Sequence, residues 1–385
     1  MNVFKKTSKF DCFLEKLKGV DWVIFACMAI LMSFGLLSMT SSELFGTVFW
    51  RQFFLVIIAL TVYIASSFFD YRNLKNSYIL LAIYGFMIFL LLLIFAFGYV
   101  SKGGNRWFNL GEFFIGPSEP MKVVLILILA KYFSKRHLAI ANIKNIFYSL
   151  IYLIPPVLLI VLQPDLSTAL VLCAIWFGML LVSGLSKKHI LWFFGIAIVL
   201  GLLTWNFFLL PYQKNRIINF INPTQDLQGG GWNAYQSIVA VGSGGAFGKG
   251  VGYGTQSRLG FLPEHETDFI FASFTEEWGF VGAMIVFTLF GIIIYRLVKK
   301  SQKGNSNFET LFMLGVCIWL VTQTTFNIGM NIGILPVTGI PLPLMSKGGS
   351  HLLAEALALG MCVGMSRYGR PAHPDKFKDE FLGLE

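Results

Sequence analysis

Charged residues are scarce in this chain of 385 residues. Asp, Glu, Lys and Arg make up 13% of it, against the ~25% usual in soluble domains, whereas hydrophobic residues make up 56%. The mean hydropathy is +0.69. This composition argues against a soluble enzyme and predicts a polytopic membrane protein.

Common catalytic and metal-binding motifs are also missing. The sequence has no Walker A motif, no GxSxG and no GxGxxG in a strand–turn–helix context, so neither ATP hydrolysis nor serine-hydrolase chemistry is indicated. None of its five histidines lies in an HxxxH or CxxC arrangement. The five cysteines fall in segments expected in the membrane or on its inner side, so no disulfide framework is indicated. The first apolar segment lacks a small-residue cleavage site, so no cleavable signal is expected.

Long apolar windows are abundant. Ten of them have the length that crosses ~30 Å of hydrocarbon, and they fall near 20–39, 48–68, 77–99, 118–134, 145–162, 166–183, 189–210, 268–297, 308–330 and 350–368. The predicted fold is therefore an all-α polytopic membrane protein with ten transmembrane helices. The short fourth helix, and the fifth with Pro155 and Pro156, are expected to be kinked or broken.

Basic residues are distributed unevenly among the predicted loops. If the N-terminus is cytoplasmic, 21 of the 30 Lys and Arg residues lie in inner segments. This positive-inside bias places residues 1–19 and 371–385 in the cytoplasm, flanking a membrane domain at 20–370. The net charge of +10 then follows from topology, and no nucleic-acid partner is indicated.

Two outer segments are too long to be simple connections. Residues 100–117 are expected to form a compact polar and aromatic loop, and residues 211–267 a large extracytoplasmic loop between helices seven and eight. Eleven glycines between Gly229 and Gly260 exclude one regular helix there. Apolar pieces within the loop predict that it is partly re-entrant and borders a cavity that opens outward.

Asp268 stands where this loop enters the eighth apolar segment. A carboxylate is costly at that position, so it is either a helix N-terminal cap or a functional group. Partial desolvation beside a cavity could raise its pKa toward the range of a general base. The neighbouring acids are expected to support the site or to pair inside the bundle, and they are Glu264, Glu266, Glu276 and Glu277.

Several cations and one aromatic residue are expected on the same outer face. The cations could together bind a pyrophosphate, although each alone could equally reach lipid headgroups: Arg51, Arg106, Lys122, Arg216, Lys249, Arg258 and Lys347. Trp107 could stack on a sugar ring or anchor the chain at the membrane interface. No organic cofactor is indicated. A Mg²⁺ or Mn²⁺ held by one or two outer carboxylates and substrate phosphates is a candidate.

Ordered motifs over about residues 20–370 resemble the shape, elongation, division and sporulation (SEDS) family. They include GGNRWFNLG, GPSEPMK, QPDLSTAL, RIINFINP, AYQSIVAVGSGGAFGKG, TDFIFASFTEEWG and NIGMNIGILPVTGIPLPLMSKGGS. Two segments, PVTGIPLP and GTQSRLGFLPE, resemble the elongation (RodA) type of the family rather than the division (FtsW) type.

The resemblance implies a peptidoglycan glycosyltransferase that polymerises lipid II at the outer face of the bacterial cytoplasmic membrane. It also implies a complex with a class B penicillin-binding protein, the crosslinking transpeptidase. The presumed catalytic aspartate of the family matches Asp268. Other family positions match Trp107, Ser118, Glu119, Lys122, Gln236, Ser237 and Lys249.

Three positions depart from the family pattern. Glu266 stands where His is common, Lys347 where an aromatic residue is expected, and Pro120 where Leu is usual. The departures are expected to alter local contacts, pH response and the entry of the fourth helix, but not the class of reaction.

The polymerisation that the resemblance implies is an inverting transfer. Asp268 would act as base, or as metal ligand, while Arg216 and Lys249 would neutralise the pyrophosphate that leaves. The alternatives are a lipid II flippase and a non-catalytic scaffold for the transpeptidase. Broken helices and buried charges suit a transporter equally well, but the gathering of acids and cations at one face favours the polymerase.

Overall fold

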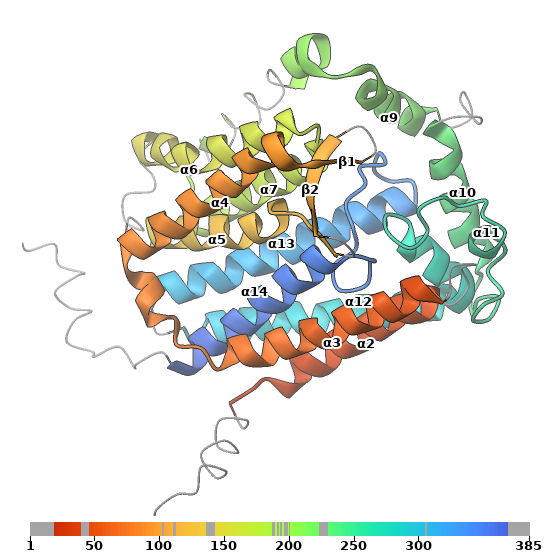
Figure 1. Ribbon diagram of the computed structural model, residues 1–385, viewed down its shortest axis with the longest axis horizontal. Coiled ribbons are helices and arrows are strands. Elements are labelled where there is room, and N and C mark those ends of the chain that lie inside the picture. The colour runs from red at the N-terminus through yellow and green to blue at the C-terminus, as the bar shows by residue number, and fades with distance from the viewer. Residues whose placement is uncertain are drawn as a thin grey trace, which may run out of the picture.

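The computed structural model describes residues 19–39, 46–101, 104–110, 113–135, 143–186, 189–190, 192, 195, 199, 201–222, 230–304 and 306–368. It is mostly helical, and most helices run roughly along the long axis of the molecule (Figure 1). The predicted cytoplasmic segments 1–19 and 371–385 lie, except for Gly19, outside the described residues.

Six described helices are long and apolar enough to cross a membrane. They are α3 (Thr47–Ser67), α4 (Ser77–Phe97), α6 (Ile143–Leu162), α12 (Ile270–Ser301), α13 (Asn307–Asn331) and α14 (Gly349–Tyr368). Three further predicted windows contain helices of 17 residues each, namely α2 (Trp22–Ser38), α5 (Ser118–Ser134) and α7 (Leu166–Val182). Seven of the 22 residues in the predicted seventh window, 189–210, lie outside the described residues. The described part of this window includes the short π-helix η3 (Thr204–Phe208).

Helix α13 is the centre of the bundle, because it contacts α5, α7, α12 and α14 (Figure 1). Its Trp319 and Phe312 are fully buried. At one end of the bundle, the 3₁₀ turn η2 (Tyr71–Lys75) joins α3 to α4. Basic residues near that end include Lys75, Arg296 and Arg367.

The predicted loop at 100–117 is partly a small sheet. Strands β1 (Tyr99–Ser101), β2 (Gly104–Leu110) and β3 (Phe113–Ile115) pair antiparallel in that order. The fold is thus mostly helical rather than strictly all-α. Short strands of this kind carry too little alternation for the sequence to have predicted them.

Two expected irregularities are absent. Helix α6 is continuous through Pro155 and Pro156 rather than broken. In α5, Pro120 occupies the first turn, where backbone N–H groups have no partner within the helix and a proline is tolerated. The departure at Pro120 therefore leaves the start of α5 intact.

The long segment 211–267 folds into helices α9 (Pro211–Ile221), α10 (Gly230–Ser243) and α11 (Thr255–Arg258). They lie together near the end of the bundle opposite η2 (Figure 1). After α10, a segment named here the glycine segment (residues 244–254) packs against α12.

Helix α12 is broken at Gly279, whose φ of 66° and ψ of −163° are not helical. The break removes the helical hydrogen bonds from residues 280 and 281 to residues 276 and 277. The glycine segment replaces them with four backbone hydrogen bonds of 2.9–3.1 Å: Phe280 to Gly245, Val281 to Ala246, Lys249 to Glu276 and Gly250 to Glu277. Non-helical backbone at membrane depth requires such pairing.

Glycine is required at this contact because two backbones meet there. A Cβ at Gly279 would overlap the backbone nitrogen of Gly248, and one at Gly248 would overlap the carbonyl of Glu277. Both residues also have a positive φ, which is strained for any residue with a side chain.

We expect Gly279→Ala to destabilise the protein by more than ~2 kcal/mol, because it combines backbone strain with overlap. Gly291→Ala is the matched control, since Gly291 lies in the same helix and a Cβ there would contact nothing within 4 Å. The thermal unfolding midpoint in detergent, followed by tryptophan fluorescence, checks this. Equal midpoints for the two variants would contradict the role given to the break.

Candidate functional site

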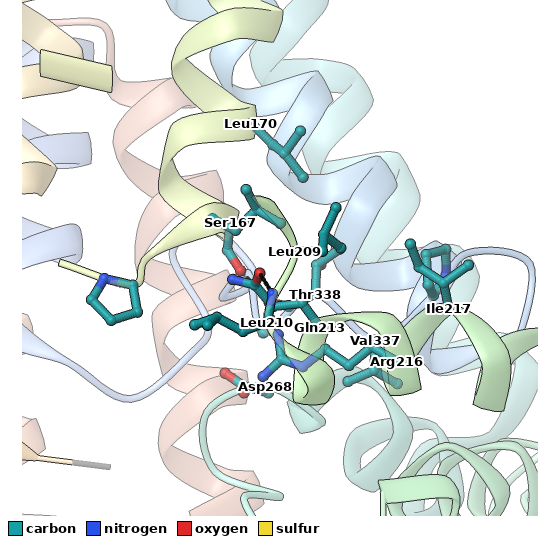
Figure 2. A pocket seen from close by; sticks show the side chains of 14 residues that line it. Ser167, Leu170, Leu209, Leu210, Gln213, Arg216, Ile217, Asp268, Val337 and Thr338 are labelled. Atoms are coloured by element: carbon teal, nitrogen blue, oxygen red, sulfur yellow. Dashed lines mark hydrogen bonds between the residues drawn. The ribbon is translucent and has the colours of Figure 1, made fainter. Parts of the chain in front are cut away.

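A cavity of about 500 Å³ lies between the start of α7, α9, residues 336–339 and Asp268, which stands two residues before α12 (Figure 2). Asp268 and Arg216 are the two charged residues among its described lining residues. The others are Pro164, Leu166, Ser167, Leu170, Leu209, Leu210, Gln213, Ile217, Pro336, Val337, Thr338 and Gly339. A half-buried carboxylate and a guanidinium thus share one cavity.

The backbone of Asp268 is fixed by two amides of α13. Its carbonyl accepts hydrogen bonds from Asn327 Nδ2 (2.9 Å) and Asn331 Nδ2 (3.2 Å). Helix α12 has Phe269 as its N-cap, without a side-chain cap bond, and the N–H of Ala272 donates to Asn331 Oδ1 at 3.1 Å. Asn331 therefore caps α12 from a neighbouring helix, and the N-cap residue of α12 is Phe269.

Asn327 and Asn331 hold the backbone at Asp268, and the sequence analysis did not single them out. Both are fully buried, and Asn327 also donates to the Ile340 carbonyl at 2.8 Å. Two amides four residues apart lie on one face of a helix, and in an otherwise apolar span they need partners. That spacing in NIGMN was the available signal.

Arg216 is held in the cavity by the chain segment beside Asp268. Its Nη1 donates to the Thr338 carbonyl at 3.1 Å, and the Ser167 hydroxyl donates to the same carbonyl. Figure 2 shows the guanidinium directed toward the Asp268 carboxylate. Gly339 leaves space next to this carboxylate, because a Cβ there would lie 3.1 Å from Asp268 Oδ2.

Lys249 and Glu276 form an ion pair away from the cavity lining, with 2.7 Å between Nζ and Oε1. The fully buried Glu276 carboxylate also accepts from the backbone N–H groups of Thr255 (2.8 Å) and Gln256 (3.1 Å). Glu277 accepts from the N–H of Gly252 at 3.1 Å. Glu276 thus pairs with a basic group and with backbone, and Glu277 pairs with backbone. These are the kinds of partner that were predicted for the two acids.

Two residues that were predicted to bind substrate, Ser237 and Gln236, lie at or near α13. Ser237 is buried and donates to the carbonyl of Asn331 at 2.9 Å, so it supports the residue that caps α12. Gln236 precedes it and is also buried.

The remaining predicted binding residues lie outside the cavity lining. Lys122 is buried, pairs with Glu119 at 2.8 Å and lies 5.7 Å from the centre of the Trp319 ring. The Trp107 ring, in strand β2, packs over Gly116, where a Cβ would lie 3.0 Å from it. The side chain of Arg106 falls outside the described residues.

Two of the three departures from the family pattern meet in the structure. The Lys347 ammonium pairs with the carboxylate of Glu266, and the Lys347 N–H donates to the Glu266 carbonyl at 2.9 Å. The neighbouring Ser346 hydroxyl donates to the Thr267 carbonyl at 2.7 Å. Glu264, in contrast, is exposed and accepts from the Thr267 hydroxyl at 3.0 Å. The Glu266–Lys347 pair thus joins the segment before Asp268 to the segment before α14.

We expect Glu266→Gln and Lys347→Met each to lower the thermal unfolding midpoint, because either change leaves one charge without its partner. The double variant should lose less than the sum, with a coupling of about 1 kcal/mol, since Lys347 is one-third exposed. Additive losses in this double-mutant cycle would show that the pair contributes nothing.

The chain is similar to known proteins over most of its length. The model of a family described as cell cycle protein (FtsW, RodA and SpoVE) matches residues 17–370. The chain is 38% identical over 287 residues to the peptidoglycan glycosyltransferase MrdB of Escherichia coli K12, covering 74% of this chain and 76% of that protein. Proteins named probable peptidoglycan glycosyltransferase FtsW also match.

Two solved structures share the fold. One, described as "Structural coordination of polymerization and crosslinking by a peptidoglycan synthase complex", superposes with a TM-score of 0.79 at 29% identity, covering 91% of this chain and 99% of that chain. The other is the rod shape determining protein RodA of Thermus thermophilus, with a TM-score of 0.68 at 27% identity and coverage of 91% and 97%.

Proposed function

The chain belongs to the FtsW, RodA and SpoVE family of cell cycle proteins, and we propose that it is a peptidoglycan glycosyltransferase of the RodA type that polymerises lipid II. The observation that carries the proposal is the cavity in which Asp268 and Arg216 meet. A polymerase needs a base for the acceptor hydroxyl and positive charge for the leaving group, and this lining offers one of each.

In the proposed reaction, Asp268 takes the proton from the C4 hydroxyl of the acceptor sugar. That oxygen attacks the anomeric carbon of the donor, and the bond from this carbon to the pyrophosphate breaks with inversion. Pyrophosphate leaves as an anion, so no general acid is needed. Arg216, fixed by the Thr338 carbonyl, stabilises the developing charge.

A divalent cation at this site is a second part of the proposal. The described residues contain no group of three or more His, Cys, Asp or Glu side chains able to hold a metal. Mg²⁺ or Mn²⁺ would therefore take Asp268 as its protein ligand and oxygens of the substrate for the rest, the mode usual for phosphate substrates. Polymerisation assays with EDTA and with added Mn²⁺ test this requirement.

We further propose ten transmembrane helices, both termini in the cytoplasm, and an active site at the outer face of the cytoplasmic membrane. The uneven distribution of basic residues supports this orientation. The pairing of the glycine segment with the break in α12 supports a partly re-entrant outer segment. A class B penicillin-binding protein is the proposed partner, because the similar chain described above comes from a complex of polymerisation and crosslinking.

We expect Asp268→Asn to lower the rate of glycan polymerisation by roughly 100-fold or more, because the amide cannot act as base. The measurement is formation of glycan product from lipid II by the purified, partner-bound protein. Asp70→Asn is the matched control, since Asp70 pairs with Arg72 at the opposite end of the bundle. Product at the wild-type rate from a folded Asp268→Asn protein would end the base assignment, and lipid II translocation without product would favour the flippase.

We expect Arg216→Gln to lower the same rate by roughly 100-fold, because it removes the cation that faces the leaving pyrophosphate. Arg258→Gln removes an exposed cation from α11, outside the cavity lining, and should leave the rate near the wild-type value. Similar losses in both variants would indicate a general electrostatic effect of the outer face instead of a site at Arg216.

A further inference from the structure

A second cavity, of about 180 Å³, lies near the other end of the bundle, where α4 begins and α5 ends. Its lining includes Ser77 and Leu81 from α4, Lys131 and Lys135 from the end of α5, and Tyr152 from α6. These three helices contact one another. The cavity shares no residue with the Asp268 cavity, and the proposed transfer reaction does not use it.

The charge of this cavity is positive. Lys131 and Lys135 are one helical turn apart on the same face of α5, an arrangement of like charges that is unfavourable without an anion nearby. The lining contains no Asp or Glu, and no ion pair joins either lysine to a carboxylate within the described ranges. Lys131 donates one hydrogen bond to the Lys75 carbonyl, while the Lys75 ammonium is paired with Glu309 at 2.9 Å.

The walls of the cavity are fixed. The Tyr132 hydroxyl donates to the Asn145 carbonyl at 2.9 Å, and the Tyr84 hydroxyl donates to the Tyr152 carbonyl at the same distance. Ser77, the first residue of α4, adds a hydroxyl to the lining. The volume is below the ~300–1,000 Å³ of sites that enclose a whole small ligand. It suits a headgroup whose remaining atoms lie outside.

Exposed apolar side chains lie on two of the helices that border the cavity. On α4, Leu81 and Phe86 are 49% and 58% exposed, and on α6, Ile151 and Leu158 are 60% and 55% exposed. Such side chains in a membrane bundle face acyl chains. Basic pockets between transmembrane helices on the cytoplasmic side bind anionic lipid headgroups.

We propose that this cavity binds the phosphate of an anionic glycerophospholipid, with the ammonium groups of Lys131 and Lys135 on the phosphate and the acyl chains along α4 and α6. The exposed apolar side chains of α4 and α6 favour a lipid over a free phosphate compound. The site is separate from the proposed transfer site, so the two proposals can fail independently.

Native mass spectrometry of the delipidated, full-length protein titrated with phosphatidylglycerol tests the proposal. The variant Lys131→Gln/Lys135→Gln should bind about 30-fold more weakly than wild type, because each lysine near an anionic lipid contributes a factor of about five. The matched control Lys299→Gln/Lys303→Gln removes two lysines from the same end of the bundle but outside the cavity, and should bind nearly as wild type. The double replacement of Lys131 and Lys135 by Arg should also retain binding.

Two further arms identify the ligand. Phosphatidylcholine should bind much more weakly than phosphatidylglycerol, and glycerol 3-phosphate at the same concentration should not displace the lipid. Equal phosphatidylglycerol binding by the cavity and control variants would overturn the site, and displacement by glycerol 3-phosphate would identify a soluble anion as the ligand. If the double variant fails to fold, Lys135→Gln alone, at an exposed position, gives the same comparison against Lys303→Gln.

Discussion

The backbone of α12 must be paired where it is not helical, and the glycine segment and two amides of α13 meet this requirement. At the break at Gly279, the glycine segment supplies the hydrogen bonds that the helix loses. At the start of the helix, Asn331 of α13 accepts from the N–H of Ala272, while Asn327 and Asn331 hold the carbonyl of Asp268. Unpaired backbone groups would be costly at either place. The position of Asp268 is thus a consequence of how α12 begins.

Several buried acids already have partners within the bundle. Glu276 binds Lys249 and the backbone of α11, and Glu119 binds Lys122 inside the bundle. Groups paired in this way already have their hydrogen bonds and are poorly placed to take part in a reaction. Asp268, in contrast, lines a cavity of about 500 Å³. This contrast separates the candidate catalytic carboxylate from the other acids of the same sequence run.

The sequence allowed the helical class, most of the helix windows and Asp268 to be predicted, because long apolar runs and an isolated carboxylate are local signals. The break at Gly279 could not be predicted, since the run from 268 to 297 reads as one continuous apolar helix and the break depends on a partner segment some 30 residues earlier. The cap from Asn331 is missed for the same reason, as it comes from another helix. Likewise, the cations of the outer face could be counted from the sequence, but only the fold shows that Arg216 enters the cavity while Lys249 and Lys347 are paired elsewhere.

The pair of Glu266 and Lys347 shows why two departures from the family pattern can occur together without loss of the site. Glu266 is 9% exposed, and its Oε1 has no hydrogen-bond partner within the described part of the chain, so the carboxylate depends on Lys347 for its stabilisation. A buried charge without its partner is strongly unfavourable, whereas a neutral pair at the same two positions would need no compensation. Glu266 alone would therefore leave a charge two residues from Asp268. Lys347 alone would leave a charge on the segment packed against residue 266. With both present, the charges cancel locally, and Asp268 remains the one carboxylate in the described lining of the cavity.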